Sequence, residues 1–168
     1  MFHKILVAID RTSLGEYVFG KALSLAKTLD AELMLLHVLS ADAEDSPQMP
    51  VSTISMRSFS TMEATAFDVY QKQWQEFEAH GLEFLQLHAQ TASEAGVKTE
   101  FTQLPGHPGR LICELALNWQ ADLVVVGRRG LSGLSELFLG SISNYVLHHA
   151  SCEVLMIHSP AEAPKAGT

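Results

Sequence analysis

Apolar residues in this chain are grouped into short continuous runs, separated by segments with a helical repeat. Residues 4–10, 31–39 and 123–126 form continuous apolar runs, broken only by Lys4 and Asp10 at the ends of the first and by Glu32 and His37 in the second. Consecutive apolar positions are typical of strands buried on both faces of a parallel sheet. Residues 97–103 alternate between apolar and polar, which indicates a half-exposed edge strand. With a short last run at Val154–Ile157, the pattern predicts five strands, the last of them at an edge.

The segments between these runs repeat their apolar residues every three or four positions, as helices packed on one face do. Thr12 or Ser13 is placed to cap the first of these helices, which should end near Asp30. Pro108 suits the first turn of another helix, and residues 141–150 predict a short one. Strands that alternate with helices in this way predict the α/β class: a doubly wound open sheet of five parallel strands, in the order 3-2-1-4-5, with helices on both faces.

A long helical region is expected from Thr61 to Ala95, with Gly81 bending or splitting it. Residues 40–62 contain two prolines and many Ser and Thr residues, and predict a mobile surface loop. Residues 159–168 are expected to be a disordered tail, so the predicted domain spans residues 1–158. The predicted apolar face of the long helix consists of Phe67, Tyr70, Trp74, Phe77, Leu82, Leu85 and His88.

Ligands of open parallel sheets bind beyond the carboxyl ends of the strands. In this chain those places are Asp10, residues 38–39, residues 104–108 and the segment that starts at Gly127. The last of them carries the strongest chemical signal, because glycines let the backbone approach a ligand closely.

The glycine segment reads Gly127-Arg128-Arg129-Gly130, and nine residues later Gly140-Ser141 opens a predicted helix. Successive N–H groups in such a turn bind anions, and a helix N-terminus adds its unpaired N–H groups. The serine hydroxyl and either arginine can add hydrogen bonds. The spacing therefore suits a phosphate site, although spacing alone is equally compatible with turns and helix caps. Neither a P-loop nor a dinucleotide-binding motif is present in the sequence.

Composition narrows the choice of ligand. Eleven basic against nineteen acidic residues give a net charge of −8, which disfavours nucleic acid but not a small anion held by backbone amides. The histidine spacing gives no metal site, and no Ser-His-acid arrangement is evident. Two cysteines, no leader and no membrane-length apolar segment predict a cytoplasmic protein that does not associate with membranes.

With these features the sequence resembles the universal stress protein family, and in particular its ATP-binding branch. The similar segments are the opening KILVAID, AELMLLHV, the turn at Gly106, the block ADLVVVGRRGLSGLSELFLGS and the closing VLHHASCEVLMIH. The resemblance implies that the chain binds ATP, ADP or AMP, with or without Mg²⁺, and acts in stress response or regulation. The residues implied to bind the nucleotide are Ala8, Ile9, Asp10, Val38, Val126, Gly127, Arg128, Arg129, Gly130, Gly140, Ser141 and Ile142.

The resemblance implies separate roles within that set. Asp10 would accept hydrogen bonds from ribose hydroxyls, Val38 would contact adenine, and the glycine segment would hold ribose and phosphates. Three places depart from the family pattern: Arg11-Thr12-Ser13 follows the aspartate where many members have Gly-Ser, Arg128 stands where a small polar residue is common, and His107 stands where relatives are often acidic.

The apolar last strand also predicts how the chain associates with other chains. An apolar edge strand is covered when it pairs across a two-fold axis, so a homodimer through Val154–Ile157 is expected, together with an unidentified regulatory protein partner. No residue is assigned as catalytic or as a metal ligand. Two other functions remain open: a slow ATPase or nucleotide transferase that uses Asp10 and a metal, and an interaction module without a ligand.

Overall fold

The computed structural model describes residues 1–43, 45–48, 61–128 and 140–158. Five parallel strands form one sheet in the order β3-β2-β1-β4-β5, which confirms the predicted class and strand order. In the described part of the chain, no helix combines the length and the apolar character that crossing a membrane requires. The elements are β1 (Lys4–Ala8), α1 (Ser13–Leu29), β2 (Glu32–Leu39), α2 (Thr61–Glu94), β3 (Thr99–Pro105), α3 (Pro108–Trp119), β4 (Leu123–Arg128), α4 (Ser141–His149) and β5 (Glu153–His158).

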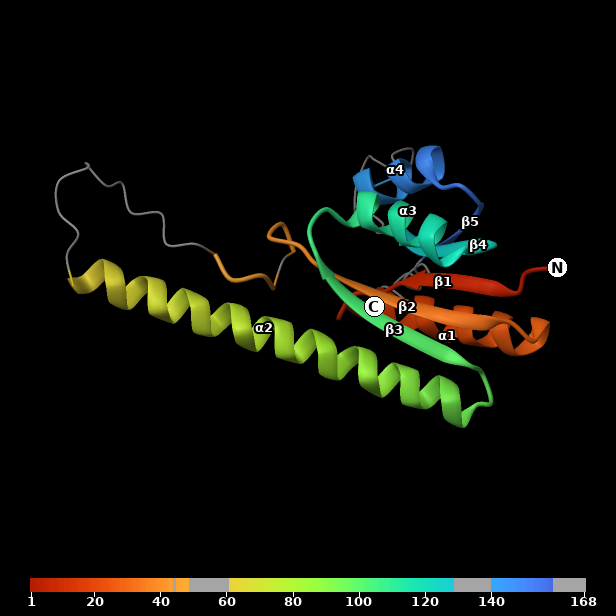
Figure 1. Cartoon of the computed structure of the whole chain (residues 1–168), viewed down its shortest axis with the longest axis horizontal. Helices are drawn as coiled ribbons and strands as arrows, with labels where there is room; N and C mark the ends of the chain where they lie inside the picture. Colours follow the sequence, from red (N-terminus) through yellow and green to blue (C-terminus); the bar gives the residue numbers. More distant parts are fainter. Residues whose placement is uncertain (44, 49–60, 129–139, 159–168) are drawn as a thin grey trace, which may run out of the picture.

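Helices cover both faces of the sheet (Figure 1). Ile5 and Val7 of β1 pack with α1 and α2 on one face, whereas Leu6 packs with α3 and α4 on the other. All three side chains are fully buried. Burial on both faces is why the central strands have consecutive apolar residues.

The ends of α1 are as predicted. Thr12 is the N-cap, and its hydroxyl accepts a hydrogen bond from the Gly15 N–H. Asp30 is the C-cap, in the left-handed region at φ 54°. β1 ends at Ala8, before the end of the predicted run at Asp10. The chain therefore leaves the sheet before it forms the cap of α1.

The long helix differs from expectation at Gly81, where α2 continues without a break. A Cβ there would lie 2.2 Å from Gln103 Oε1 and 2.8 Å from the ring of His37, so glycine allows close packing of α2 on the sheet. The buried His37 donates from Nδ1 to Gln103 Oε1 at 3.0 Å, and burial lowers its pKa. Phe67 and Leu82 were wrongly assigned to the packed face, because they are 51% and 41% exposed.

The connection from β3 to α3 begins later than the sequence predicts. β3 starts at Thr99 rather than Val97 and runs to Pro105, so the predicted turn at residues 104–108 reduces to Gly106 and His107. Gly106 has φ 141°, which favours glycine. β3 and β5 are the two edge strands, as predicted.

α2 begins at Thr61, where the helical region was predicted to start, so the last two residues of the predicted loop at residues 40–62 belong to the helix. The first part of the loop turns back at Ser40, where the Ala43 N–H donates to the Ser40 carbonyl at 3.2 Å. Residues 44 and 49–60 of this loop, and the tail at 159–168, lie outside the described residues.

Candidate functional site

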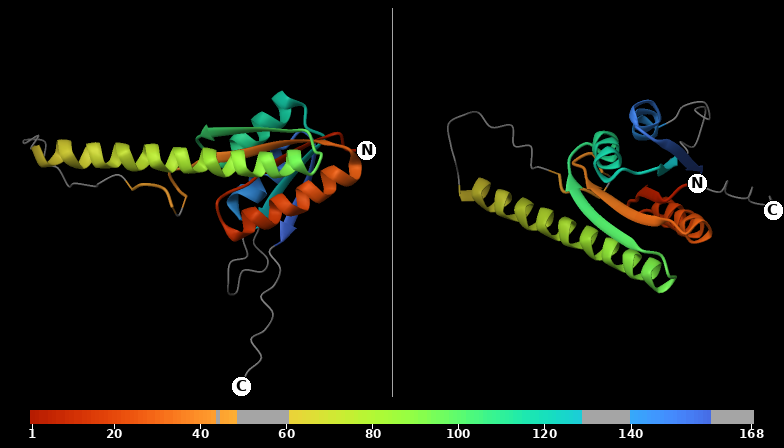
Figure 2. Two further views of the ribbon diagram at one scale, coloured as in Figure 1. Left: turned by 90° about the horizontal axis from the view of Figure 1, so that it is seen from below. Right: turned by 45° about the vertical axis from the view of Figure 1, so that its right-hand side comes forward.

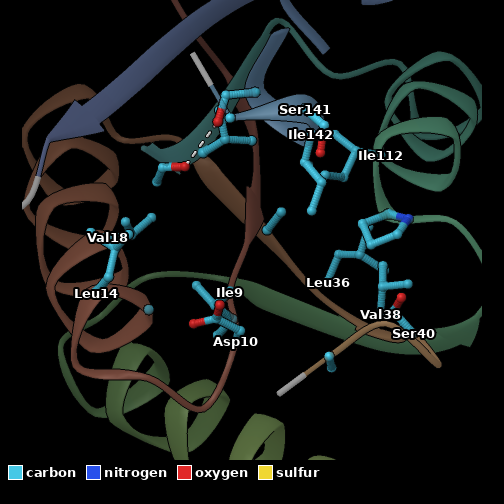
Figure 3. A pocket seen from close by; sticks show the side chains of 18 of the residues that line it. Ile9, Asp10, Leu14, Val18, Leu36, Val38, Ser40, Ile112, Ser141 and Ile142 are labelled. Atoms are coloured by element: carbon cyan, nitrogen blue, oxygen red, sulfur yellow. Dashed lines mark hydrogen bonds between the residues drawn. The ribbon is translucent and has the colours of Figure 1, made fainter. Parts of the chain in front are cut away.

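A cavity of about 370 Å³ lies beyond the carboxyl ends of β1, β2 and β4. The cavity lies where the strand order changes direction, between β1 and its neighbour β4. The helix α1 packs on one face of the sheet at this point, and α3 and α4 pack on the other face. Figure 3 shows Leu14 and Val18 on one side of the cavity, and Ile112 with Ser141 and Ile142 on the opposite side. Open α/β sheets bind their ligands at this type of crevice.

Most of the predicted site residues are brought together here. Arg128 is the last residue of β4, half-buried, and does not line the cavity. Arg129 and Gly130 lie outside the described residues. The predicted residues that line the cavity are Ala8, Ile9, Asp10, Val38, Val126, Gly127, Gly140, Ser141 and Ile142.

The Asp10 carboxylate is oriented by the start of α1. Its Oδ1 accepts hydrogen bonds from the Thr12 backbone N–H, at 3.2 Å, and from the Thr12 hydroxyl. The same hydroxyl accepts from the Gly15 N–H at 3.2 Å. One threonine thus caps the helix and holds the carboxylate of Asp10 at the cavity.

Gly15 is required by the close approach of α1 to the end of β1. A Cβ at this position would lie 2.0 Å from the Asp10 carbonyl oxygen and 2.7 Å from its Oδ1. Contacts of this length do not occur for real side chains, and the obstacle is backbone that cannot rotate away. Gly15 therefore lets α1 begin directly against Asp10.

The start of α4 forms the opposite wall. Gly140 is its N-cap, with no side-chain hydrogen bond to the first turn. The first N–H groups of a helix have no partner within the helix, and the helix dipole makes this end favourable for anions. The buried Ser143 donates its hydroxyl to the Gly127 carbonyl at 3.1 Å, which fixes α4 against the end of β4. The wall can therefore present backbone N–H groups to an anion.

Sequence reasoning missed part of the lining. His107 and Pro108 lie in the predicted connection at residues 104–108, but neither was named as a site residue. Gly15 could have been predicted, because a glycine in the first turn of a helix that directly follows a strand indicates close packing at the strand end. The other missed residues are packing or loop positions without such a signal: Leu14, Val18, Leu36, Ser40, Asp42, Ala43, Ile112 and Ser143.

The lining of the cavity is mainly apolar, with Asp10, Asp42 and His107 as its titratable side chains. Within the described ranges, no three His, Cys, Asp or Glu side chains are grouped so that they could hold a metal ion. Apolar walls with a few placed polar groups are typical of sites for small organic ligands.

Known proteins with this architecture include several solved structures. The chain matches the hypothetical protein MJ0577 with a TM-score of 0.73 at 18% identity, covering 96% of this chain and 99% of that one. It matches the Arabidopsis thaliana protein At3g01520, crystallised with AMP bound, with a TM-score of 0.60 at 23% identity, covering 95% and 93%. A universal stress protein in complex with cAMP matches with a TM-score of 0.60 at 21% identity, covering 94% and 97%. At these identities the likeness establishes the shared fold.

Sequence similarity is higher to curated bacterial proteins. The universal stress protein Sll1388 of Synechocystis is 40% identical over 157 residues, which are 93% of this chain and 97% of that protein. The protein YxiE of Bacillus subtilis, also a universal stress protein, is 34% identical over 157 residues, which are 94% and 99% of the two chains. Residues 1–158 match the model of the universal stress protein family. The chain therefore belongs to the universal stress protein family.

Proposed function

We propose that the chain is an adenine-nucleotide-binding protein of the stress-response or regulatory type, and that the cavity beyond β1, β2 and β4 is its binding site. The observation that carries the proposal is the convergence of nine predicted residues, from four separate parts of the chain, on one cavity of about 370 Å³. This volume falls within the range of roughly 300–1,000 Å³ that is usual for small-molecule sites.

The adenosine part fits the side of the cavity formed by the strand ends. Ile9 and Val38 supply apolar surface there, and Leu36 and Ile112 extend it. Asp10, held by Thr12, is proposed to accept hydrogen bonds from the ribose hydroxyls. Asp10 is half-buried at the cavity, and its hydrogen bonds from Thr12 orient the carboxylate so that ribose hydroxyls could donate to it as well.

The phosphates are proposed to bind at the start of α4. Gly140 and Ser141 bring backbone N–H groups and one hydroxyl to the cavity, and Gly127 faces them from the end of β4. Arg128, Arg129 and Gly130 are proposed as further phosphate contacts on the basis of the sequence spacing. Mg²⁺, where it takes part, would be held mainly through phosphate oxygens.

Two structural neighbours support the choice of ligand class, because one was crystallised with AMP and the other with cAMP. We propose ATP, ADP or AMP as the ligand of this chain, and binding rather than turnover as its mode of action. A nucleotide-dependent change at the surface would then reach a regulatory protein partner.

The decisive experiment identifies the nucleotide directly. The purified protein is denatured, any released nucleotide is identified by mass spectrometry, and melting is compared with ATP, ADP, AMP and cAMP, each with and without Mg²⁺. At one hundred times its dissociation constant a ligand stabilises the fold by about 2.7 kcal/mol, which is a shift of several degrees. If no adenine nucleotide shifts the melting temperature, the proposed function is wrong.

A matched pair of glycine variants tests the location of the site. A Cβ at Gly140 or at Gly20 would meet no atom of the described residues within 4 Å, so both Gly140→Val and Gly20→Val should fold. Gly140 lines the cavity and Gly20 lies on α1 outside the lining. The nucleotide shift should disappear in Gly140→Val and persist in Gly20→Val. An equal response from the two variants would place the nucleotide elsewhere.

We also propose that the chain forms a homodimer through β5. This strand pairs with β4 on one side, and no described strand pairs with its other edge. Leu155 is 39% exposed on it, and an apolar edge strand is a natural template for pairing. Light scattering should show a dimer, and Leu155→Asp should convert it to a monomer. A dimer that persists in this variant would contradict pairing through β5.

A further inference from the structure

The helix α1 and the C-terminal half of α2 pack on the same face of the sheet (Figures 1 and 2). Both helices contribute to one apolar cluster, with Val18 and Ala22 from α1 and Leu85 and Ala92 from α2. A histidine of α2, His88, is buried in this contact and is only 4% exposed. It does not line the cavity, so its burial has another cause than the proposed nucleotide site.

Both ring nitrogens of His88 lie against hydrogen-bond acceptors. Nδ1 is 2.7 Å from the carbonyl oxygen of Phe84, one turn earlier in α2. Nε2 is 2.9 Å from Oε2 of Glu16, in the first turn of α1. A carbonyl oxygen and an ionised carboxylate accept hydrogen bonds and cannot donate them. Each ring nitrogen must therefore carry a proton, and a ring with two N–H groups is an imidazolium cation.

The carboxylate of Glu16 is in a setting that favours its charged form. Its side chain is 57% exposed, so water also solvates the carboxylate. It lies in the first turn of α1, where the helix dipole favours a negative charge. The proton between the two groups therefore belongs on the ring of His88 and not on the carboxylate.

Aromatic side chains shield the ring of His88 from water. Phe19 of α1 stands at 86° to it with ring centroids 4.5 Å apart, and the centroid of Phe84 is 4.2 Å away. A buried charge is costly unless it is paired, and the pair is stronger where water is excluded. If His88 lost one proton, either Nε2 would face the carboxylate as a second acceptor, or Nδ1 would face the carbonyl in the same way. One of the two hydrogen bonds would therefore be lost.

A second buried histidine has different partners. His37 of β2 is also 4% exposed and lies against the same Phe84 ring, with centroids 6.2 Å apart. Its Nδ1 donates to Gln103 Oε1, which requires a single proton, and burial lowers the pKa of His37. In the part of the chain that the structure describes, Glu16 and His37 are the titratable side chains that approach His88 from α1 and from β2. Equal burial thus leads to a neutral ring at His37 and a cationic ring at His88.

We infer that His88 is a pH-sensitive clamp between α1 and α2: its doubly protonated ring binds the Glu16 carboxylate to α2, and loss of one proton opens this contact. The clamp holds the first turn of α1, next to Gly15 and the cap formed by Thr12. Its contribution to stability is present while the ring keeps both protons and is lost as the pH rises. The inference does not depend on nucleotide.

NMR of the wild-type protein tests the charge of the ring directly. The ¹⁵N chemical shifts of an imidazole distinguish a ring with two N–H groups from a ring with one. The signals of His88 are assigned through its contacts with the rings of Phe19 and Phe84. At about pH 7, where an unperturbed histidine is mainly neutral, His88 should carry two protons and His37 one. A neutral His88 ring at this pH overturns the inference.

The variant Glu16→Ala tests whether the charged pair holds the two helices together. At about pH 7 the folding equilibrium constant should fall about fivefold, as expected for a partly exposed hydrogen bond between charged groups. Glu83→Ala is the control and should change little, because Glu83 is exposed on α2, about 140° around the helix axis from His88.

The pH dependence of the same comparison separates the clamp from a simple loss of packing. Urea unfolding is recorded from about pH 7 to about pH 9, a range over which histidine side chains become neutral. The wild type and Glu16→Ala should converge as the pH rises. A difference that stays constant with pH, or an equal loss of stability in Glu83→Ala, overturns the inference.

Discussion

The two ends of the sheet are built differently. At the amino end, side chains close the structure: the Asp122 carboxylate accepts from the His3 and Lys4 backbone N–H groups at 2.7 and 2.8 Å. The Lys4 ammonium donates to the Trp119 carbonyl at 3.1 Å and lies 4.9 Å from the centre of the Trp119 ring. At the carboxyl end, the first turn of α4 has no side-chain cap and a cavity is open.

The difference predicts which changes affect ligand binding as well as stability. Groups at the amino end are paired with each other, so changes there should alter unfolding and leave ligand affinity unchanged. Groups at the carboxyl end are placed by glycines and short turns, and a change there should affect the cavity. The following experiments test this division.

The largest effect is expected at Gly15. In Gly15→Ala the new Cβ meets the Asp10 carbonyl oxygen, so the start of α1 must move away from β1. Overpacking against backbone costs about 1–3 kcal/mol, and we expect a value near the upper end, together with weaker nucleotide binding. Denaturant unfolding and nucleotide-dependent melting measure the two effects. Full stability in Gly15→Ala would show that α1 can shift freely.

A smaller effect is expected at Asp122. Its two backbone hydrogen bonds lower its pKa, so its carboxylate stabilises the folded state. Asp122→Asn should cost about 1 kcal/mol at neutral pH, while the nucleotide shift stays unchanged. A loss of nucleotide binding in this variant would break the proposed division between the two ends.

The stabilisation by the Asp122 carboxylate should depend on pH. Because the folded pKa lies below the unfolded value, the stabilisation is complete above about pH 4 and is lost as the pH falls through the folded pKa. Urea unfolding of the wild type and Asp122→Asn should therefore differ at pH 7 and converge in acid. A difference that stays constant with pH would contradict this assignment.

The smallest effect is expected at Lys4. Lys4→Met removes the contact with the Trp119 ring and one hydrogen bond, and should cost about 0.5 kcal/mol. Lys27→Met, in the last turn of α1, is the matched control for removing a surface charge. The two variants are compared by thermal unfolding, and an equal change would show that the Trp119 contact contributes nothing.

Much of the fold was predictable because it follows from local rules. Consecutive apolar runs identified the buried strands, and Thr12 and Pro108 identified the starts of two helices. Gly81 misled the prediction, since its role is to admit His37 and Gln103, which lie far away in sequence. A single sequence does not reveal which distant side chains a glycine will meet.

The candidate site was predictable to a similar degree. The strand ends and the glycine spacing located the cavity, because ligands of parallel sheets bind at those ends. The walls at Leu14, Leu36 and Ile112 were not predicted, since their periodicity indicates only that they are packed. Leu82 shows the opposite error: an apolar residue near the helical repeat that points to solvent.

The length of α2 has a mechanical consequence. Its 34 residues span roughly 50 Å, and only its C-terminal half is fixed to the sheet. A tilt of about five degrees at the fixed half would swing the far tip by roughly 2–4 Å, the width of a side chain. A slight rotation of the fixed half would therefore displace the other end of the helix by several ångströms.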